Sequence, residues 1–91
     1  MALTKETVVD KIEVMEMGQV QVRTATRVLE DGVALSSSFH RHVVEPSTKS
    51  GDTWADTDIS GEDARVQAVA NATWTSAVKT AYQEMIDAQE L

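Results

Sequence analysis

The sequence has no cysteine and very few aromatic residues, and each shortage excludes a class of protein. Without cysteine the chain has no disulfide framework, no thiol nucleophile and no cysteine-ligated zinc. One Phe, one Tyr and two Trp among 91 residues leave few large side chains, so we expect most of them in the core. Stability must therefore come from packing, with association between chains as a further source.

Basic residues and long apolar runs are also scarce. Eight Lys and Arg stand against 15 Asp and Glu, which gives a formal net charge of -7 at pH 7. Nucleic-acid binding depends on the neutralisation of phosphates by basic groups, so DNA and RNA are not expected partners. The apolar runs span only a few residues, and residues 1–11 lack a basic segment followed by an apolar one. We therefore expect no transmembrane helix, no signal peptide and no membrane partner.

The remaining composition is typical of one small domain spanning residues 1–91, with 42% hydrophobic and 25% charged residues. Residues 12–44 are rich in Val and Thr and alternate with period two, whereas residues 61–90 carry apolar groups at helical spacing. The predicted fold class is α+β. It consists of a three-stranded antiparallel β-meander, with strands at about residues 8–15, 19–30 and 33–44, followed by two short C-terminal α-helices packed on one face.

The dipeptide Asp31-Gly32 predicts the turn between the second and third strands, because a type I′ turn needs positive φ at both central residues. Pairing Glu30 with Val33 then sets the register of every later pair. One face becomes mostly apolar, with Val28 opposite Leu35, Thr24 opposite Phe39, Val22 opposite Arg41 and Val20 opposite Val43. The other face becomes polar, with Arg27 opposite Ser36, Ala25 opposite Ser38, Arg23 opposite His40 and Gln21 opposite His42.

Two loop lengths compete for the first turn. A two-residue loop ending at Gly18 places Glu13 opposite Val22 on the apolar face, whereas a three-residue loop over residues 16–18 places Ile12 there. The longer loop is preferred, because it also puts Gly18 where a type I turn followed by a bulge requires a left-handed residue.

Residues 45–59 are predicted to form a linker, because the only proline, Pro46, is followed by residues that favour turns and extended chain. The linker is longer than most connections, and such loops are commonly functional or flexible. We expect Trp54 and Ile59 to pin it to the domain.

Two helices are predicted after the linker. Ser60, with Asp63 three residues later, approximates a capping box that starts a helix over about residues 61–73. Thr75 caps the second helix, over about residues 76–89. The residues on one stripe of each helix are Val66, Val69, Ala70, Thr73 and Trp74 on the first, and Val78, Ala81, Tyr82, Met85 and Ile86 on the second.

His40-Arg41-His42 is the sharpest chemical feature, because residues two apart on a strand project from the same face and could share a metal ion. The chain has no other His, so a metal site would need carboxylates, or His pairs from several copies around an axis. The alternative, which we favour, is that both imidazoles lie on a side of the strand that faces solvent or another subunit. We therefore predict no metal and no cofactor, and an interaction surface formed by Arg23, His40, Arg41 and His42.

Two further patterns start a chemical motif without completing it. The segment Asp56–Gly61 matches the opening of an EF-hand loop, but Gln67 stands where the bidentate glutamate is required. Alternation places Ser37 and His40 on opposite faces, and nothing indicates an oxyanion hole. We expect no catalytic residue, no enzymatic activity and no small-molecule substrate.

Three stretches resemble a family of small, mostly uncharacterised proteins encoded by tailed bacteriophages: His40–Pro46, Ser60–Ala68, and Trp74-Thr75 followed by Ala81-Tyr82. The resemblance spans about residues 12–83 and carries no catalytic signature. It implies a virion or tail-associated protein that is made in the host cytoplasm and then held in the virion. The linker is longer than in the family at residues 47–58, so the resemblance implies no role for that loop.

These observations predict a phage structural or assembly protein whose strand edge or polar sheet face docks onto copies of itself or onto another virion protein. One alternative is a regulatory module that binds a host protein in the infected cytoplasm through its acidic surface. The acidic residues are spread over strands, loop and helices, which disfavours a dedicated mimic of nucleic acid. A third alternative is a metal-dependent oligomer held together by His40 and His42.

Overall fold

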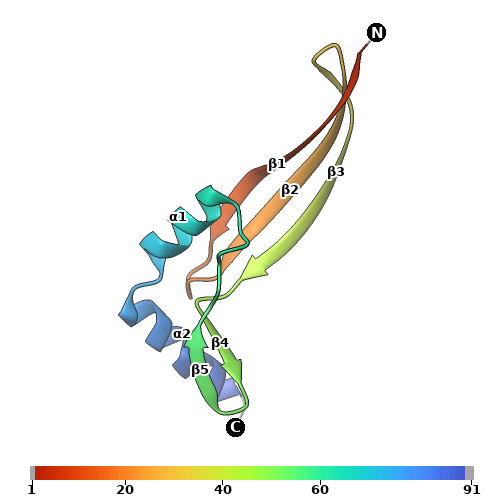
Figure 1. Cartoon of the computed structure of the whole chain (residues 1–91). Helices are drawn as coiled ribbons and strands as arrows, with labels where there is room; N and C mark the ends of the chain where they lie inside the picture. Colours follow the sequence, from red (N-terminus) through yellow and green to blue (C-terminus); the bar gives the residue numbers. More distant parts are fainter. Residues whose placement is uncertain (1, 90–91) are drawn as a thin grey trace.

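The computed structural model describes residues 2–89 and has the α+β class predicted from the sequence (Figure 1). Three long strands form an antiparallel sheet in the order β1-β2-β3: β1 (Leu3–Val14), β2 (Val20–Glu30) and β3 (Val33–Val44). A two-stranded sheet of β4 (Ser47–Ser50) and β5 (Thr53–Asp56) follows, and then helices α1 (Ala64–Thr73) and α2 (Ser76–Gln89). The predicted meander and the two C-terminal helices are confirmed.

The three-stranded sheet is much longer than the helix that packs on it (Figure 1). Helix α1 lies beside the half of the sheet near the β1–β2 loop, whereas the half that carries the Asp31-Gly32 turn extends beyond both helices. The molecule measures 58 × 25 × 21 Å, and its radius of gyration of 17.0 Å exceeds the about 12 Å expected for a compact domain of this length. The chain is therefore elongated.

The loop between β1 and β2 is the predicted three-residue loop. The Met15 N–H donates to the Gln19 carbonyl at 2.8 Å, and Gly18 has a φ of 90°. Ile12 lies opposite Val22, as predicted. The first strand begins earlier than predicted, at Leu3, because its N-terminal residues pair with the far end of β2 as well.

The predicted register of β2 and β3 is wrong beyond the turn. Asp31 and Gly32 have φ values of 51° and 86°, which confirms the type I′ turn. A β-bulge at Leu35 then gives β3 one extra residue, so that Val28 lies opposite Ser36 rather than Leu35. Every later residue of β3 is displaced by one position.

This displacement exchanges the two faces of β3, because side chains alternate along a strand. On the face that α1 covers, the pairs are Thr24 with His40, Val22 with His42 and Val20 with Val44. On the opposite face, which we call the open face, they are Ala25 with Phe39, Arg23 with Arg41 and Gln21 with Val43. The predicted polar face, with Arg23 against His40 and Gln21 against His42, is therefore not formed.

The segment 45–59 is not the continuous linker that the sequence predicted, because it contains the β4–β5 hairpin. Gly51, with a φ of 61°, begins its two-residue turn. The predicted contacts of Trp54 and Ile59 with the rest of the domain are confirmed. The Trp54 ring meets the Tyr82 ring of α2 edge-on, with centroids 6.1 Å apart, and Ile59 packs against the core.

The core lies where α1 crosses the sheet. Its buried residues are Val20, Val22, Val44, Val66, Ala70 and Trp74. Val66, Ala70 and Trp74 recur at helical spacing along α1 and its C-terminal end, so one stripe of the helix supplies half of the cluster.

The capping residue of α1 differs from the prediction, whereas that of α2 is confirmed. Asp63 is the N-cap of α1, and its carboxylate accepts from the Arg65 N–H at 2.9 Å. Ser60 instead donates its N–H to the Asp58 carboxylate at 2.9 Å, so the helix starts three residues later. The Thr75 hydroxyl accepts a hydrogen bond from the first turn of α2 at 3.3 Å.

Among residues 2–89, no helix combines the length and the apolar character needed to cross a membrane.

Candidate interaction surface

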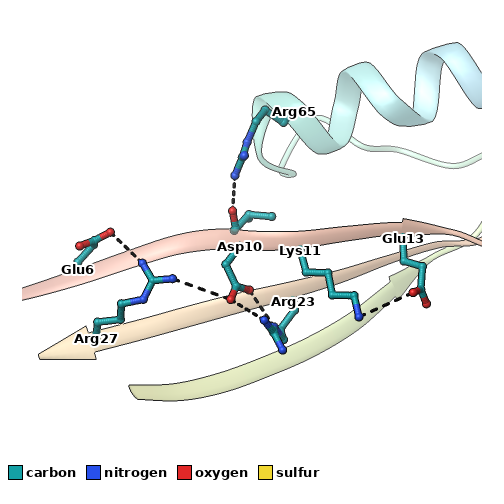
Figure 2. Close-up of polar contacts among 8 residues, drawn as sticks. Glu6, Asp10, Lys11, Glu13, Arg23, Arg27 and Arg65 are labelled. Carbon is teal, nitrogen blue, oxygen red and sulfur yellow. Dashed lines mark hydrogen bonds and ion pairs between the residues drawn. The ribbon is translucent and has the colours of Figure 1, made fainter. Parts of the chain in front are cut away.

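The open face of the sheet carries a row of ion pairs between β1 and β2 (Figure 2). Arg23 donates from Nε and Nη2 to the two carboxylate oxygens of Asp10 at 3.0 and 2.8 Å. Arg27 lies between Glu6, at 3.2 Å, and Asp10, at 4.0 Å. The hydrogen bond from Arg23 holds the pKa of the Asp10 carboxyl below its usual range and raises the pKa of the guanidinium in return. Both groups are therefore charged at neutral pH.

Phe39 sits on this network. The Arg23 guanidinium carbon lies 4.5 Å from the centre of the Phe39 ring, within the range of a cation–π contact. Arg23 is thus held between a carboxylate and an aromatic face. The Phe39 side chain nevertheless remains 50% exposed.

Strand β3 forms the less protected edge of the sheet, with one arginine and a bulge at Leu35, close to the turn. All of its residues are exposed except His42 and Val44. Its exposed large apolar side chains are Val33, Leu35, Phe39 and Val43. It contains no Asp or Glu, and within residues 2–89 no strand pairs with its outer side. A long edge of this kind is a template for pairing with another chain, and natural proteins usually cover or charge it.

Strand β1, at the other edge, has more protection than β3. Its charged residues are Lys5, Glu6, Asp10, Lys11 and Glu13. A β-bulge at Asp10 interrupts its regular pairing, and Arg65 reaches from α1 to donate a hydrogen bond to the Val9 carbonyl (Figure 2). Charges, bulges and covering side chains are the means by which natural edge strands avoid association. The two edges of the sheet are therefore unequal.

The structure separates the four residues that the sequence predicted as one interaction surface. Arg23 and Arg41 lie opposite each other on the open face, whereas His40 and His42 lie on the face that α1 covers. The two imidazole rings are stacked with centroids 6.2 Å apart, as their spacing on a strand predicted. His42 donates from Nε2 to the Glu62 carboxylate at 2.7 Å. In the part of the chain that the structure describes, no group of three or more His, Cys, Asp or Glu side chains is placed to hold a metal ion.

The acidic segment that resembles an EF-hand opening is used for other contacts. Asp56 accepts a hydrogen bond from Lys79 of α2 at 2.9 Å. Asp58 accepts the N–H of Ser60, and this hydrogen bond lowers the pKa of its carboxyl. The Asp56 carboxylate therefore binds α2, and the Asp58 carboxylate stabilises the turn before α1.

The sequence did not predict the exposure of Phe39 or the contacts that protect β1. Phe39 was placed on the apolar face, and only the bulge at Leu35 turns it outward. The bulge at Asp10 had a signal, because the alternation of β1 breaks at Val8-Val9, where two apolar residues are adjacent. No local pattern in the sequence indicates the hydrogen bond from Arg65 to Val9, because only the tertiary fold brings these two residues together.

Comparison of the chain with protein-family models, with curated proteins and with solved structures found no match. The function is therefore inferred from the geometry of the sheet and from the sequence itself.

Proposed function

We propose that the chain is a structural or assembly protein of a tailed bacteriophage, which acts by binding other protein chains through the edge of β3. The observation that carries this proposal is the contrast between strand β3, with 12 residues, no carboxylate and one arginine, and strand β1, with five charged residues and a hydrogen bond from Arg65. The phage assignment rests on the sequence resemblance described above. The proposed action requires neither a catalytic group nor a cofactor.

The exposed area of the chain supports a binding role. The folded chain exposes 6067 Å², compared with about 5,200 Å² expected for a compact protein of 9.9 kDa. The excess is roughly 900 Å², which is close to the about 800 Å² that each partner contributes to a protein interface of standard size. An elongated chain with this surplus is well suited to being covered by a partner.

The small core supports the same role. The buried hydrophobic residues cluster at one end of the long sheet, and most of them are Val or Ala. A core of this size supplies limited stability to a domain of this length. A partner that binds only the folded chain would add stability through mass action.

Mass spectrometry of purified virions and of assembly intermediates tests the proposal. We expect peptides of this chain to be enriched with the particles relative to the soluble lysate of infected cells. A chain that stays in the soluble lysate and is absent from both particles and intermediates would contradict the proposal, and would favour a regulatory module that binds a host protein.

A further inference from the structure

We infer that the partner of the β3 edge is β3 of a second copy of this chain, paired antiparallel around a two-fold axis at Phe39. The inference rests on the proposed function, because it names the partner of the same edge. It is specific enough to fix which residues lie opposite each other.

The residues on either side of Phe39 are complementary in size. Three serines, Ser36–Ser38, precede Phe39, and the three large residues His40–His42 follow it. When two antiparallel copies are aligned at Phe39, each serine lies opposite a large residue of the second copy. The opposed pairs are Ser38 with His40, Ser37 with Arg41 and Ser36 with His42. Each large side chain thus has room beside a small hydroxyl-bearing neighbour.

This alignment also keeps the two faces of the sheet distinct. Directly opposed residues of an antiparallel pair point to the same face. Ser37, Phe39 and Arg41 all belong to the open face, so the pairing joins the open faces of the two copies. The two Phe39 rings then meet beside the axis, each already held by its own Arg23. Their contact removes an exposed aromatic side chain from water.

Two other alignments fit less well. An alignment centred on Ser38 pairs only residues 36–40 before it meets the bulge, and it sets Arg41 opposite the exposed Leu35 and Phe39 opposite Ser37. An alignment centred on Arg41 sets two guanidinium groups directly against each other, which is destabilising. The alignment at Phe39 pairs residues 36–42, the stretch of β3 from the bulge to His42, and avoids both contacts.

The distribution of charge favours β3 as the place where two copies meet. Each chain carries a formal net charge of -7, so two copies repel each other over most of their surfaces. Residues 33–44 include no carboxylate and one arginine. The β3 edge is therefore a segment along which two acidic chains can approach without opposing carboxylates.

Single-cysteine variants test the pairing directly, because the chain has no cysteine and any disulfide must join two chains. Opposed Cα atoms in an antiparallel pair lie about 4.5–5.5 Å apart, a distance that a disulfide spans. We expect Phe39→Cys to form a covalent dimer when it is oxidised with diamide. Ser37→Cys is the matched control, because its two copies would lie about 14 Å apart along the strand. It should form a dimer only when it is mixed with Arg41→Cys, a combination that retains Phe39.

A charge exchange tests the same register without oxidation. Ser37→Arg should set arginines opposite each other at two places in the dimer and raise its Kd roughly tenfold. Adding Arg41→Glu to the same chain should restore the original Kd, because each new arginine then faces a carboxylate. Thr7→Arg, on the β1 edge, should leave the Kd unchanged. Sedimentation equilibrium measures all four proteins.

A chain that stays monomeric at all concentrations would overturn the inference, as would Ser37→Cys that dimerises alone as readily as Phe39→Cys. Neither result affects the proposed function, which depends on the presence of the chain in particles or intermediates. A monomeric chain that is found in particles would mean that β3 binds a different virion protein.

Discussion

The indole Nε1 of Trp74 donates to the main-chain carbonyl of Gly18 at 2.7 Å, and this buried hydrogen bond joins residues 56 positions apart. It connects the C-terminal end of α1 to the loop between β1 and β2. Val78 of α2 and Pro46, at the start of the β4–β5 segment, also lie against Gly18. Four parts of the chain therefore meet at one glycine.

Gly18→Ala is expected to destabilise the fold more than Gly32→Ala. Both glycines have positive φ, at 90° and 86°, where a side chain costs about 1–2 kcal/mol. A Cβ at Gly18 would lie 2.5 Å from Val78 Cγ1, whereas nothing lies within 4 Å of a Cβ at Gly32. The clash should add about 1–3 kcal/mol to the loss. Urea denaturation measures both variants, and equal losses would contradict this account of the junction.

Val22→Asp is expected to unfold the domain or to cost about 3–5 kcal/mol, because it places an unpaired carboxylate in the core. Val22 is only 1% exposed. Gln21→Asp is the neighbouring control, on the open face. It meets Glu13 across the strands, a like-charge contact that should cost less than about 1 kcal/mol. Thermal denaturation distinguishes the two, and similar melting temperatures would show that the assignment of the faces is incorrect.

The turns of the sheet could be predicted from the sequence because each depends on a local backbone requirement. Asp31-Gly32 and Gly18 occupy left-handed conformations that few other residues adopt, so their positions set the hairpins. Gly51-Asp52 carried a similar signal. The hairpin was not predicted because β4 and β5 have only four residues each, too few to show an alternating pattern, and β4 contains no apolar residue.

The faces of β3 could not be predicted, because one extra residue exchanges them. The alternate residues Val33, Leu35, Phe39 and Val43 are the more apolar set, and pattern alone assigns that set to the core. The structure exposes them and places His40 and His42 on the helix side instead. The choice between the faces depends on the bulge at Leu35 and on where α1 packs, which are properties of the tertiary fold.

Stability is expected to fall as the pH rises from about 10 to about 12. Burial raises the pKa of Tyr82 to about 12, and a hydrogen bond to the Glu45 carboxylate adds to this increase. An unfolded tyrosine has a pKa of about 10, so in this range the unfolded chain loses a proton that the folded chain retains. The contribution of Tyr82 is therefore complete below pH 10 and disappears as the pH approaches its folded pKa.

Near-ultraviolet absorbance of tyrosinate can follow this titration cleanly, because Tyr82 is the only tyrosine. Tyr82→Phe should lessen the loss of stability in the same range. A midpoint near 10 in the folded protein would contradict the expected effect of burial.

Chelation is expected to leave the association of the chain unchanged. The Nε2 atom of His42 already donates to Glu62 at 2.7 Å, so binding of a metal there would have to break this hydrogen bond. Protein purified without an affinity tag should contain no stoichiometric zinc, nickel or iron. EDTA should change the free energy of association by no more than about 0.5 kcal/mol. A stoichiometric metal whose removal dissociates the protein would instead establish the metal-dependent oligomer.

A sheet that pairs through β3 alone stops growing after a single step. Both outer strands of the joined sheet are then copies of β1, where the charges, the bulge at Asp10 and the bond from Arg65 to Val9 leave no template for another strand. Chains with two open edges can instead add to one another without limit and form fibres. If the chain pairs as inferred, strand β1 would therefore prevent further strand addition, and the chain would remain dimeric even at high concentration.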